Sequence, residues 1–307
     1  MKHNQVRQVV FPILTAFIWG TSFVAQDICA DVMSAFTFNA SRYYIATLAL
    51  LVLVAVRTAA EKKEERPSLS REEKKSARRQ LWLGGFCCGT ALAFASNFQQ
   101  AGMVAGTDSG KAGFLTALYV VLVPVFGLFF RRKVDPPVWV AVALSVAALY
   151  LLCRKGSFSL AAGDLLVLVC AVCFAVHILV IDHFTAFCDG VKLSCIQFLF
   201  AGSWSAVCML IFDNVDLHVL LSNILPLLYM GVFSCGIGYT LQILAQKDSN
   251  PTVVTILLSL ESVFAVIAGA IVLHQSMSAR EYIGCVLMFI AVLLAQIPMP
   301  AKKRAAQ

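Results

Sequence analysis

Four side chains that can bind a ligand or ionise stand inside long apolar segments, namely Arg42, His177, Gln197 and Glu261. A charged or polar group in such a place is costly unless it is paired or faces water, so function is expected there. The guanidinium of Arg42 can hold a carboxylate through paired hydrogen bonds. Glu261 can titrate a proton or bind an amine, and His177 can bind a substrate or carry protons.

Each of these residues also has a purely structural interpretation. Glu261 could be a neutral carboxyl group that is hydrogen-bonded between helices. Arg42 could form a structural ion pair or reach outward to the surface, and a neutral His177 could donate to a backbone carbonyl. The sequence leaves both interpretations open for each residue.

Six further residues complete the predicted substrate cavity. They are Trp19, Ser22, Gln100, Tyr119, Tyr239 and Gln242. The aromatic rings among them are either cavity walls or ordinary packing, and the amides are either gates or helix–helix hydrogen bonds. We expect no catalytic residue, because no buried Ser-His pair, HExxH motif or closely spaced aspartate pair occurs in the chain.

The composition indicates that these residues lie in a membrane protein. Of the 307 residues, 60% are hydrophobic and 13% are charged, with a net charge of +7; the mean hydropathy is +0.82. A soluble protein could not cover so much apolar surface, so the lipid bilayer is the expected partner. The basic residues gather in short loops, which argues against nucleic-acid binding. The 11 cysteines are scattered through apolar segments, so we expect packing rather than a metal site or cofactor.

The apolar runs predict an all-α integral membrane fold with ten transmembrane helices, since a span needs about 20 mostly apolar residues. Pro124 is expected to bend the fourth span, and Asn250-Pro251 to begin the ninth. The expected spans are residues 9–26, 33–56, 81–101, 107–130, 138–153, 164–182, 191–212, 225–245, 250–273 and 281–297.

Lysine and arginine counts predict the orientation. With the N-terminus in the cytoplasm, 19 of the 24 basic residues face the cytoplasm and four face the other side. This asymmetry places both termini in the cytoplasm of a multi-pass protein of the cell membrane. Residues 57–80 carry nine of the basic residues and are expected to form a solvated cytoplasmic linker.

The chain also contains a weak internal repeat. Residues 16–22 align with 171–177, and Arg42 aligns with Gln197, both at an offset of 155 residues. At an offset of 142 residues, Tyr119 aligns with Glu261. Each half has five spans, and an odd number forces the halves into opposite orientations. We therefore expect two inverted-topology five-helix repeats, residues 9–153 and 164–297, with the substrate near the midplane between them.

The order and spacing of several motifs resemble the EamA-type members of the drug/metabolite transporter superfamily. The motifs are Trp19-Gly20 with Ser22-Phe23, Arg42, residues 110–119 with Pro124, residues 229–234 with Tyr239, and residues 250–265. The resemblance covers residues 9 to 297. It implies two inverted five-helix bundles around a central cavity lined by the first four helices of each half.

The resemblance also implies a function. Its members export amino acids, drugs and other small metabolites, or carry nucleotide sugars and sugar phosphates. We expect a secondary transporter that exports a small metabolite such as an amino acid or a drug by alternating access, with protons as a candidate coupling ion. The alternatives are a transporter of nucleotide sugars or sugar phosphates, a channel, and a non-transporting membrane scaffold.

Overall fold

The computed structural model describes residues 2–61, 70–107, 109–129, 131, 134–153, 161–247, 249–272 and 278–296, and all regular secondary structure within them is helical. We call residues 2–153 the N-half and residues 161–296 the C-half. The N-half contains α1 (Lys2–Ala30), α2 (Ala35–Glu61), α3 (Arg71–Val104), α4 (Ser109–Ala117), α5 (Tyr119–Phe129) and α6 (Pro136–Cys153). The C-half contains α7 (Ala162–Thr185), α8 (Gly190–Phe212), α9 (Leu217–Ser222), α10 (Ile224–Leu228), the π-helix η1 (Tyr229–Tyr239), α11 (Thr240–Gln246), α12 (Pro251–Leu258), α13 (Leu260–Val272) and α14 (Ala279–Ala295).

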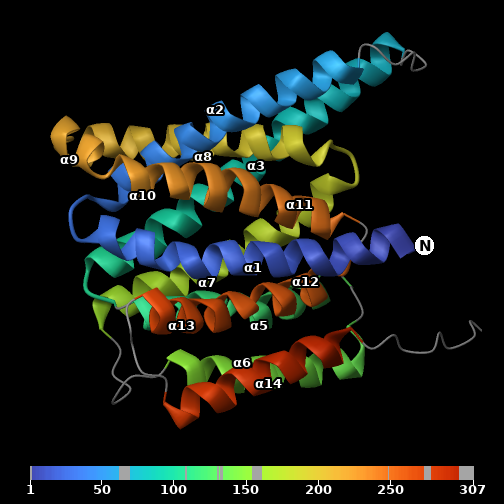
Figure 1. Ribbon diagram of the computed structural model, residues 1–307. Helices are drawn as coiled ribbons and strands as arrows, with labels where there is room; N and C mark the ends of the chain where they lie inside the picture. Colours follow the sequence, from blue (N-terminus) through green and yellow to red (C-terminus); the bar gives the residue numbers. More distant parts are fainter. Residues whose placement is uncertain are drawn as a thin grey trace, which may run out of the picture.

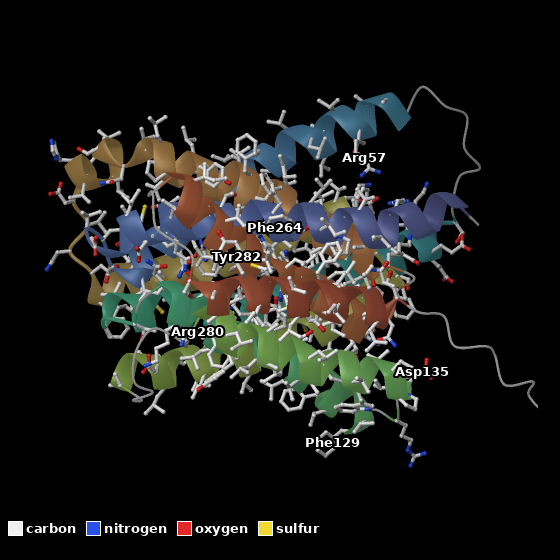
Figure 2. The ribbon with its side chains drawn as sticks, turned by 60° about the horizontal axis from the view of Figure 1, so that its bottom comes forward. Arg57, Phe129, Asp135, Phe264, Arg280 and Tyr282 are labelled. Carbon is white, nitrogen blue, oxygen red and sulfur yellow. The ribbon has the colours of Figure 1, made fainter. Side chains whose placement is uncertain are left out.

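Eight helical segments in the described part of the chain are long and apolar enough to cross a membrane, and they coincide with eight of the ten expected spans. The fifth expected span corresponds to α6, whose apolar stretch Pro136–Leu152 is shorter. The tenth corresponds to α14, which has 17 residues. The outer surface of the bundle is apolar, and Phe129 and Tyr282 are 81% and 59% exposed (Figure 2). These observations establish an all-helical membrane protein.

The helices form layers (Figure 1). α2 and α8 pack together at one edge, α6 and α14 pack together at the other, and α1 lies between these pairs. The two halves are interleaved rather than separate. In the N-half, α1 packs against α12 and α13 of the C-half, while α7 of the C-half packs against α4 and α5.

Two spans are interrupted near their centres. The fourth breaks at Leu118, where the amide donates to the carbonyl of Leu115, three residues back, at 3.3 Å. The ninth breaks at Ser259, whose hydroxyl donates to the carbonyl of Thr255 at 2.9 Å. Pro124, where a bend is expected, lies inside α5, and the interruption at Leu118 precedes it by six residues. The missing proline N–H thus does not coincide with the break.

The expected helix start at Asn250-Pro251 is confirmed. Pro251 is the first residue of α12, and the side chain of Asn250 caps the helix by accepting from the amide of Thr252 at 2.9 Å. Proline is suited to this position because the first helical N–H has no intrahelical partner.

The charged region 57–80 is largely helical where the structure describes it. α3 begins at Arg71, and its 34 residues give a length of about 50 Å, well beyond the roughly 30 Å hydrocarbon core. The exposed residues 71–79 therefore continue the helix past the apolar run. Residues 62–69 of this region lie outside the described residues, as do the expected span ends at 130, 273 and 297.

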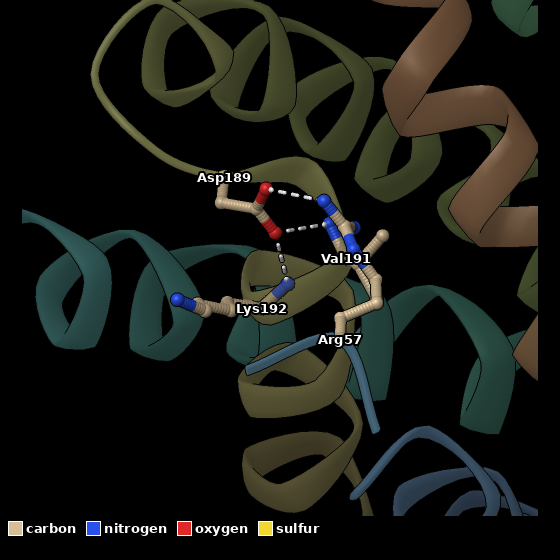
Figure 3. A network of polar contacts seen from close by, with 4 residues as sticks. All are labelled: Arg57, Asp189, Val191 and Lys192. Atoms are coloured by element: carbon tan, nitrogen blue, oxygen red, sulfur yellow. Dashed lines mark hydrogen bonds and ion pairs between the residues drawn. The ribbon is translucent and has the colours of Figure 1, made fainter. Parts of the chain in front are cut away.

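The α2–α8 pair is tied at both of its ends by carboxylates that flank α8. At one end, Asp213 accepts from the amide of Thr37 at 3.1 Å and from its hydroxyl at 2.7 Å, and Ser34 also donates to it. At the other end, Asp189 caps α8 and pairs with Arg57 of α2 at 3.4 Å (Figure 3). Both members of this second pair are about two-fifths exposed, so it contributes at most about 1 kcal/mol.

Two glycines make the same contact at two places in the bundle. A Cβ on Gly89 of α3 would lie 2.5 Å from the carbonyl oxygen of Gln197 in α8. A Cβ on Gly231 of η1 would lie 2.4 Å from a methyl carbon of Ile45 and 3.0 Å from the carbonyl oxygen of Arg42 in α2. Small residues of this kind let helix backbones approach closely in a membrane, where packing rather than the hydrophobic effect joins the helices.

We predict that Gly89→Ala and Gly231→Ala each destabilise the protein by about 1–3 kcal/mol, because backbone or a β-branched side chain must move to admit the methyl group. Thermal melting of purified protein in detergent should show a lower Tm for both. Gly113→Ala is the control, since its added Cβ would meet nothing closer than 3.7 Å. Unchanged melting of the first two variants would contradict the close approach.

Candidate functional site

A polar cavity lies inside the bundle, with walls from both halves. The volume of the cavity, measured as the space that the centre of a water-sized sphere can occupy, is about 50 Å³. This is enough room for only a few water molecules. Its walls come from α1, α2, α3, α4, α5, α7, η1, α11, α12 and α13. The lining residues are Trp19, Ser22, Phe23, Gln26, Arg42, Gln99, Thr116, Tyr119, Phe174, Ile178, Ser234, Tyr239, Gln242, Leu258 and Glu261.

Seven of the ten predicted cavity residues line this space, and three do not. Those that line it are Trp19, Ser22, Arg42, Tyr119, Tyr239, Gln242 and Glu261. The three others, Gln100, His177 and Gln197, are fully buried outside the lining.

The side chains of His177 and Gln197 are hydrogen-bonded to each other. The Nε2 atom of His177 and the side-chain oxygen of Gln197 lie 3.1 Å apart, so a histidine tautomer with its proton on Nε2 would donate to the amide. The ring of His177 packs edge-on against the ring of Tyr239, with 6.0 Å between centroids. This pair therefore supports a cavity wall from behind rather than facing the cavity.

Gln99, not Gln100, faces the cavity. Gln26 donates to the side-chain oxygen of Gln99 at 3.1 Å, and Gln99 donates to the hydroxyl of Thr116 at 2.9 Å. Both amide atoms of Gln100 lack a hydrogen-bond partner within the described part of the chain. The chain of amides joins α1, α3 and α4 across the cavity wall.

One periodic signal could have located Gln26. It continues the spacing of Trp19, Ser22 and Phe23, which places all four on one face of α1, as the structure confirms by their shared lining of the cavity. No comparable signal separates Gln99 from its neighbour, because adjacent helical residues differ by 100° in direction and both are glutamines.

Glu261 and Tyr119 meet directly in the cavity. Each residue follows the break in its span, Tyr119 as the first residue of α5 and Glu261 as the second of α13. The Tyr119 hydroxyl donates to a carboxylate oxygen of Glu261 at 3.2 Å. Glu261 is only 4% exposed, and a first-turn position places its carboxylate where the helix dipole favours negative charge.

Arg42 also lines the cavity but has no anionic partner. It is 4% exposed, and no carboxylate in the described residues lies within ion-pair distance. Its guanidinium carbon stands 4.7 Å from the ring centre of Phe38 and 5.0 Å from that of Tyr43. One terminal nitrogen donates to the Tyr43 hydroxyl at 3.3 Å, while Nε has no partner among the described residues. A buried cation without a counter-ion is energetically unfavourable, so a negatively charged ligand beside it would be stabilised.

Trp19 and Tyr239 form an aromatic part of the cavity wall. Their rings pack at an angle of 54° with 4.6 Å between centroids, and the indole N–H of Trp19 donates to the carbonyl of Ser234 at 3.1 Å. Ser234 lies in η1, a π-helix of 11 residues. π-helical turns are rare and gather at functional sites, because their wider turns leave carbonyl groups available to other partners.

The two ends of the bundle around the cavity differ. At the end opposite the N-terminus, Asp164 at the start of α7 is 1% exposed and accepts from Lys111 at 2.5 Å and from Thr107 at 3.0 Å. We call these three residues the Asp164 lock. It joins the N-half to the C-half, because Thr107 and Lys111 lie around the start of α4.

At the N-terminal end, a second pocket of about 310 Å³ lies between the same helices that line the cavity. α5 contributes Val123 and Gly127, α7 contributes Leu179, and the start of α12 contributes residues 250–252. α5, α7 and α12 therefore contribute residues both to this pocket and to the cavity. No group of three His, Cys, Asp or Glu side chains in the described residues could hold a metal ion.

Comparisons with known proteins agree with this architecture. The EamA-like transporter family matches residues 7–154 and again residues 161–296. An uncharacterized transporter of Archaeoglobus fulgidus is 29% identical over 285 residues, covering 92% of this chain and 84% of that protein. An uncharacterized transporter of Clostridium kluyveri is 25% identical over 134 residues, 43% of each chain. A solved crystal structure superposes with a TM-score of 0.75 at 17% identity, covering 94% of this chain and 96% of that one, which shows a shared fold.

Proposed function

This chain belongs to the EamA-like transporter family, and we propose that it is a secondary transporter that exports a small metabolite across the cell membrane by alternating access. The observation that carries the proposal is the cavity with polar walls in the middle of an apolar bundle, lined by Arg42 and Glu261 from opposite halves. A scaffold has no need of such a cavity, and its small volume favours a metabolite over a nucleotide sugar.

Several features support ten helices in two inverted repeats, residues 9–153 and 164–297. The family matches the chain twice. Gly89 and Gly231 are repeat partners at the offset of 142 residues, and they contact α8 and α2 around Gln197 and Arg42, which are partners at the offset of 155. Tyr119 and Glu261, also partners, meet face to face, as residues on a two-fold axis should.

The alignment of the two repeats shows a difference between the two ends of the bundle. Thr107 and Lys111 of the Asp164 lock correspond to Ser249 and Val253, and Asp164 itself corresponds to Val9. A partly buried ion pair thus closes one end, whereas a hydroxyl and two apolar side chains occupy the equivalent positions at the other, where the second pocket lies. This arrangement favours a state closed at the lock and accessible from the N-terminal end.

The basic residues give this state a direction. Their asymmetry favours a cytoplasmic location for the N-terminal end of the bundle, so the pocket between α5, α7 and α12 would admit a substrate from the cytoplasm. Opening the Asp164 lock would then release it outside. Loading inside and release outside make an exporter.

Glu261 is the proposed proton site. A buried carboxyl that accepts a hydrogen bond from the Tyr119 hydroxyl can exist charged or neutral, and the two forms would favour different occupants of the cavity. Proton binding and substrate binding at one cavity provide the linkage that coupled transport requires.

We predict that Glu261→Gln abolishes proton-coupled transport while leaving membrane insertion intact, because glutamine fills the same volume and cannot ionise. The measurement is uptake of labelled standard amino acids into vesicles of reconstituted protein, with and without a pH gradient. Glu72→Gln is the matched control, since Glu72 is exposed on the extension of α3. Wild-type stimulation by the gradient in Glu261→Gln would refute the proton site.

We also predict that Asp164→Asn opens the outer gate. The substitution removes the charge of the carboxylate that pairs with Lys111, and the loss of this partly buried ion pair destabilises the closed outer end by about 1–3 kcal/mol. A cysteine at position 99 in a background without native cysteines would then react faster with a membrane-impermeant thiol reagent added outside. Asp216→Asn is the control, because Asp216 caps α9 and is exposed. Equal reaction rates in Asp164→Asn and wild type would argue against the lock.

A further inference from the structure

The geometry points to Arg42 as the subsite for a carboxylate, so that the transported molecule is a small carboxylic acid or a zwitterion such as an amino acid. This inference deepens the proposed function and rests on it. It starts from a deeply buried cation that lines the cavity and that the described residues leave without a counter-ion.

The surroundings of Arg42 hold its guanidinium in one orientation. The rings of Phe38 and Tyr43 both stand within 5.0 Å of the guanidinium carbon. The Tyr43 hydroxyl donates to Ser96 and is therefore able to accept from Arg42 with its remaining lone pair. A guanidinium that is stacked and tethered in this way loses little freedom when a ligand binds, which favours affinity.

The remaining donors of Arg42 suit a planar acceptor. Stacking uses the faces of the guanidinium plane, whereas its N–H groups lie at the edges. Nε is buried and has no partner among the described residues, and Arg42 is part of the cavity lining. A carboxylate is planar and accepts two parallel hydrogen bonds from such an edge.

Charge balance favours a carboxylate over a phosphate group. Burying a net charge in the middle of a membrane is costly, so the occupied cavity should be close to neutral. Arg42 with a protonated Glu261 has a charge of +1 and is neutralised by a monoanion. Arg42 with an ionised Glu261 is already balanced, and a zwitterion adds no net charge to it. A phosphate dianion would leave at least one negative charge unpaired in either case.

The rest of the cavity limits the size of the ligand. Trp19, Tyr239 and Phe174 supply aromatic walls, and the free space is about 50 Å³. A small carboxylic acid or amino acid therefore needs a modest opening of the helices, whereas a sugar phosphate needs a larger one.

The test compares ligands that differ only in the carboxylate. Purified wild-type protein is melted in the presence of each standard amino acid, of the corresponding methyl ester, and of glucose 6-phosphate. We expect some amino acids to raise the Tm, while their esters and the phosphate do not. For an amino acid that raises the Tm, Arg42→Gln should weaken binding by about 10- to 100-fold, and Arg42→Lys should weaken it less, since lysine keeps the charge without the planar fork.

Arg57→Gln is the matched control, because Arg57 lies on the same helix but is exposed and paired with Asp189 at the surface (Figure 3). It should bind the amino acid as wild type does. If Arg42→Gln does not fold, the comparison of acid and ester on wild-type protein still decides the question.

Three results would overturn the carboxylate subsite. The first is equal stabilisation by an amino acid and its ester, and the second is unchanged amino-acid affinity in a folded Arg42→Gln protein. The third is stabilisation by glucose 6-phosphate alone, which would assign the subsite to phosphate. Vesicle flux separates this outcome from failure of the proposed function: a protein that transports a ligand without a carboxylate refutes only the subsite, whereas a protein that binds amino acids and moves none refutes the transporter.

Discussion

A polar side chain in the middle of a lipid-embedded bundle has no bulk water to turn to, and it must find its partners inside the protein or in a bound solute. Most polar groups in this bundle obey that constraint. Gln26, Gln99 and Thr116 form a chain of hydrogen bonds, and His177 pairs with Gln197. Arg42 is the charged exception, because it lacks an anion in the described part of the protein. The positive charge of Arg42, which no described carboxylate balances, therefore sets the chemical character of the cavity.

The same helix contacts occur twice in this bundle, but their chemistry differs. Gly89 and Gly231 make equivalent close approaches, which fix how α3 meets α8 and how η1 meets α2. At equivalent positions elsewhere the residues have diverged: Tyr119 faces Glu261, and the partner of Arg42 is the neutral Gln197. In the proposed alternating-access cycle, shared packing would keep two arrangements of the bundle close in energy, whereas unlike side chains would favour one of them and recognise a substrate.

Breaks in the helices supply the positions for this chemistry. The fourth and ninth spans are interrupted just before Tyr119 and Glu261, so each side chain emerges beside the start of a new helical segment. η1 does the equivalent for the eighth span, where a carbonyl group accepts from Trp19. Irregular backbone at this depth is tolerated because it is enclosed by protein and borders a polar cavity.

The sequence by itself determined the class of the protein, the eight longer spans, the family and the pairing of Tyr119 with Glu261. These follow from apolar run length and from residue order, which are local or one-dimensional properties. It did not show the interruption at Leu118, since propensity does not reveal how neighbouring helices stabilise a break. Only the tertiary structure decided that Gln99 faces the cavity in place of Gln100, that His177 turns to Gln197, and that no described carboxylate pairs with Arg42. Each of these depends on the rotation of one helix against several others, and that rotation is fixed by packing across the whole bundle.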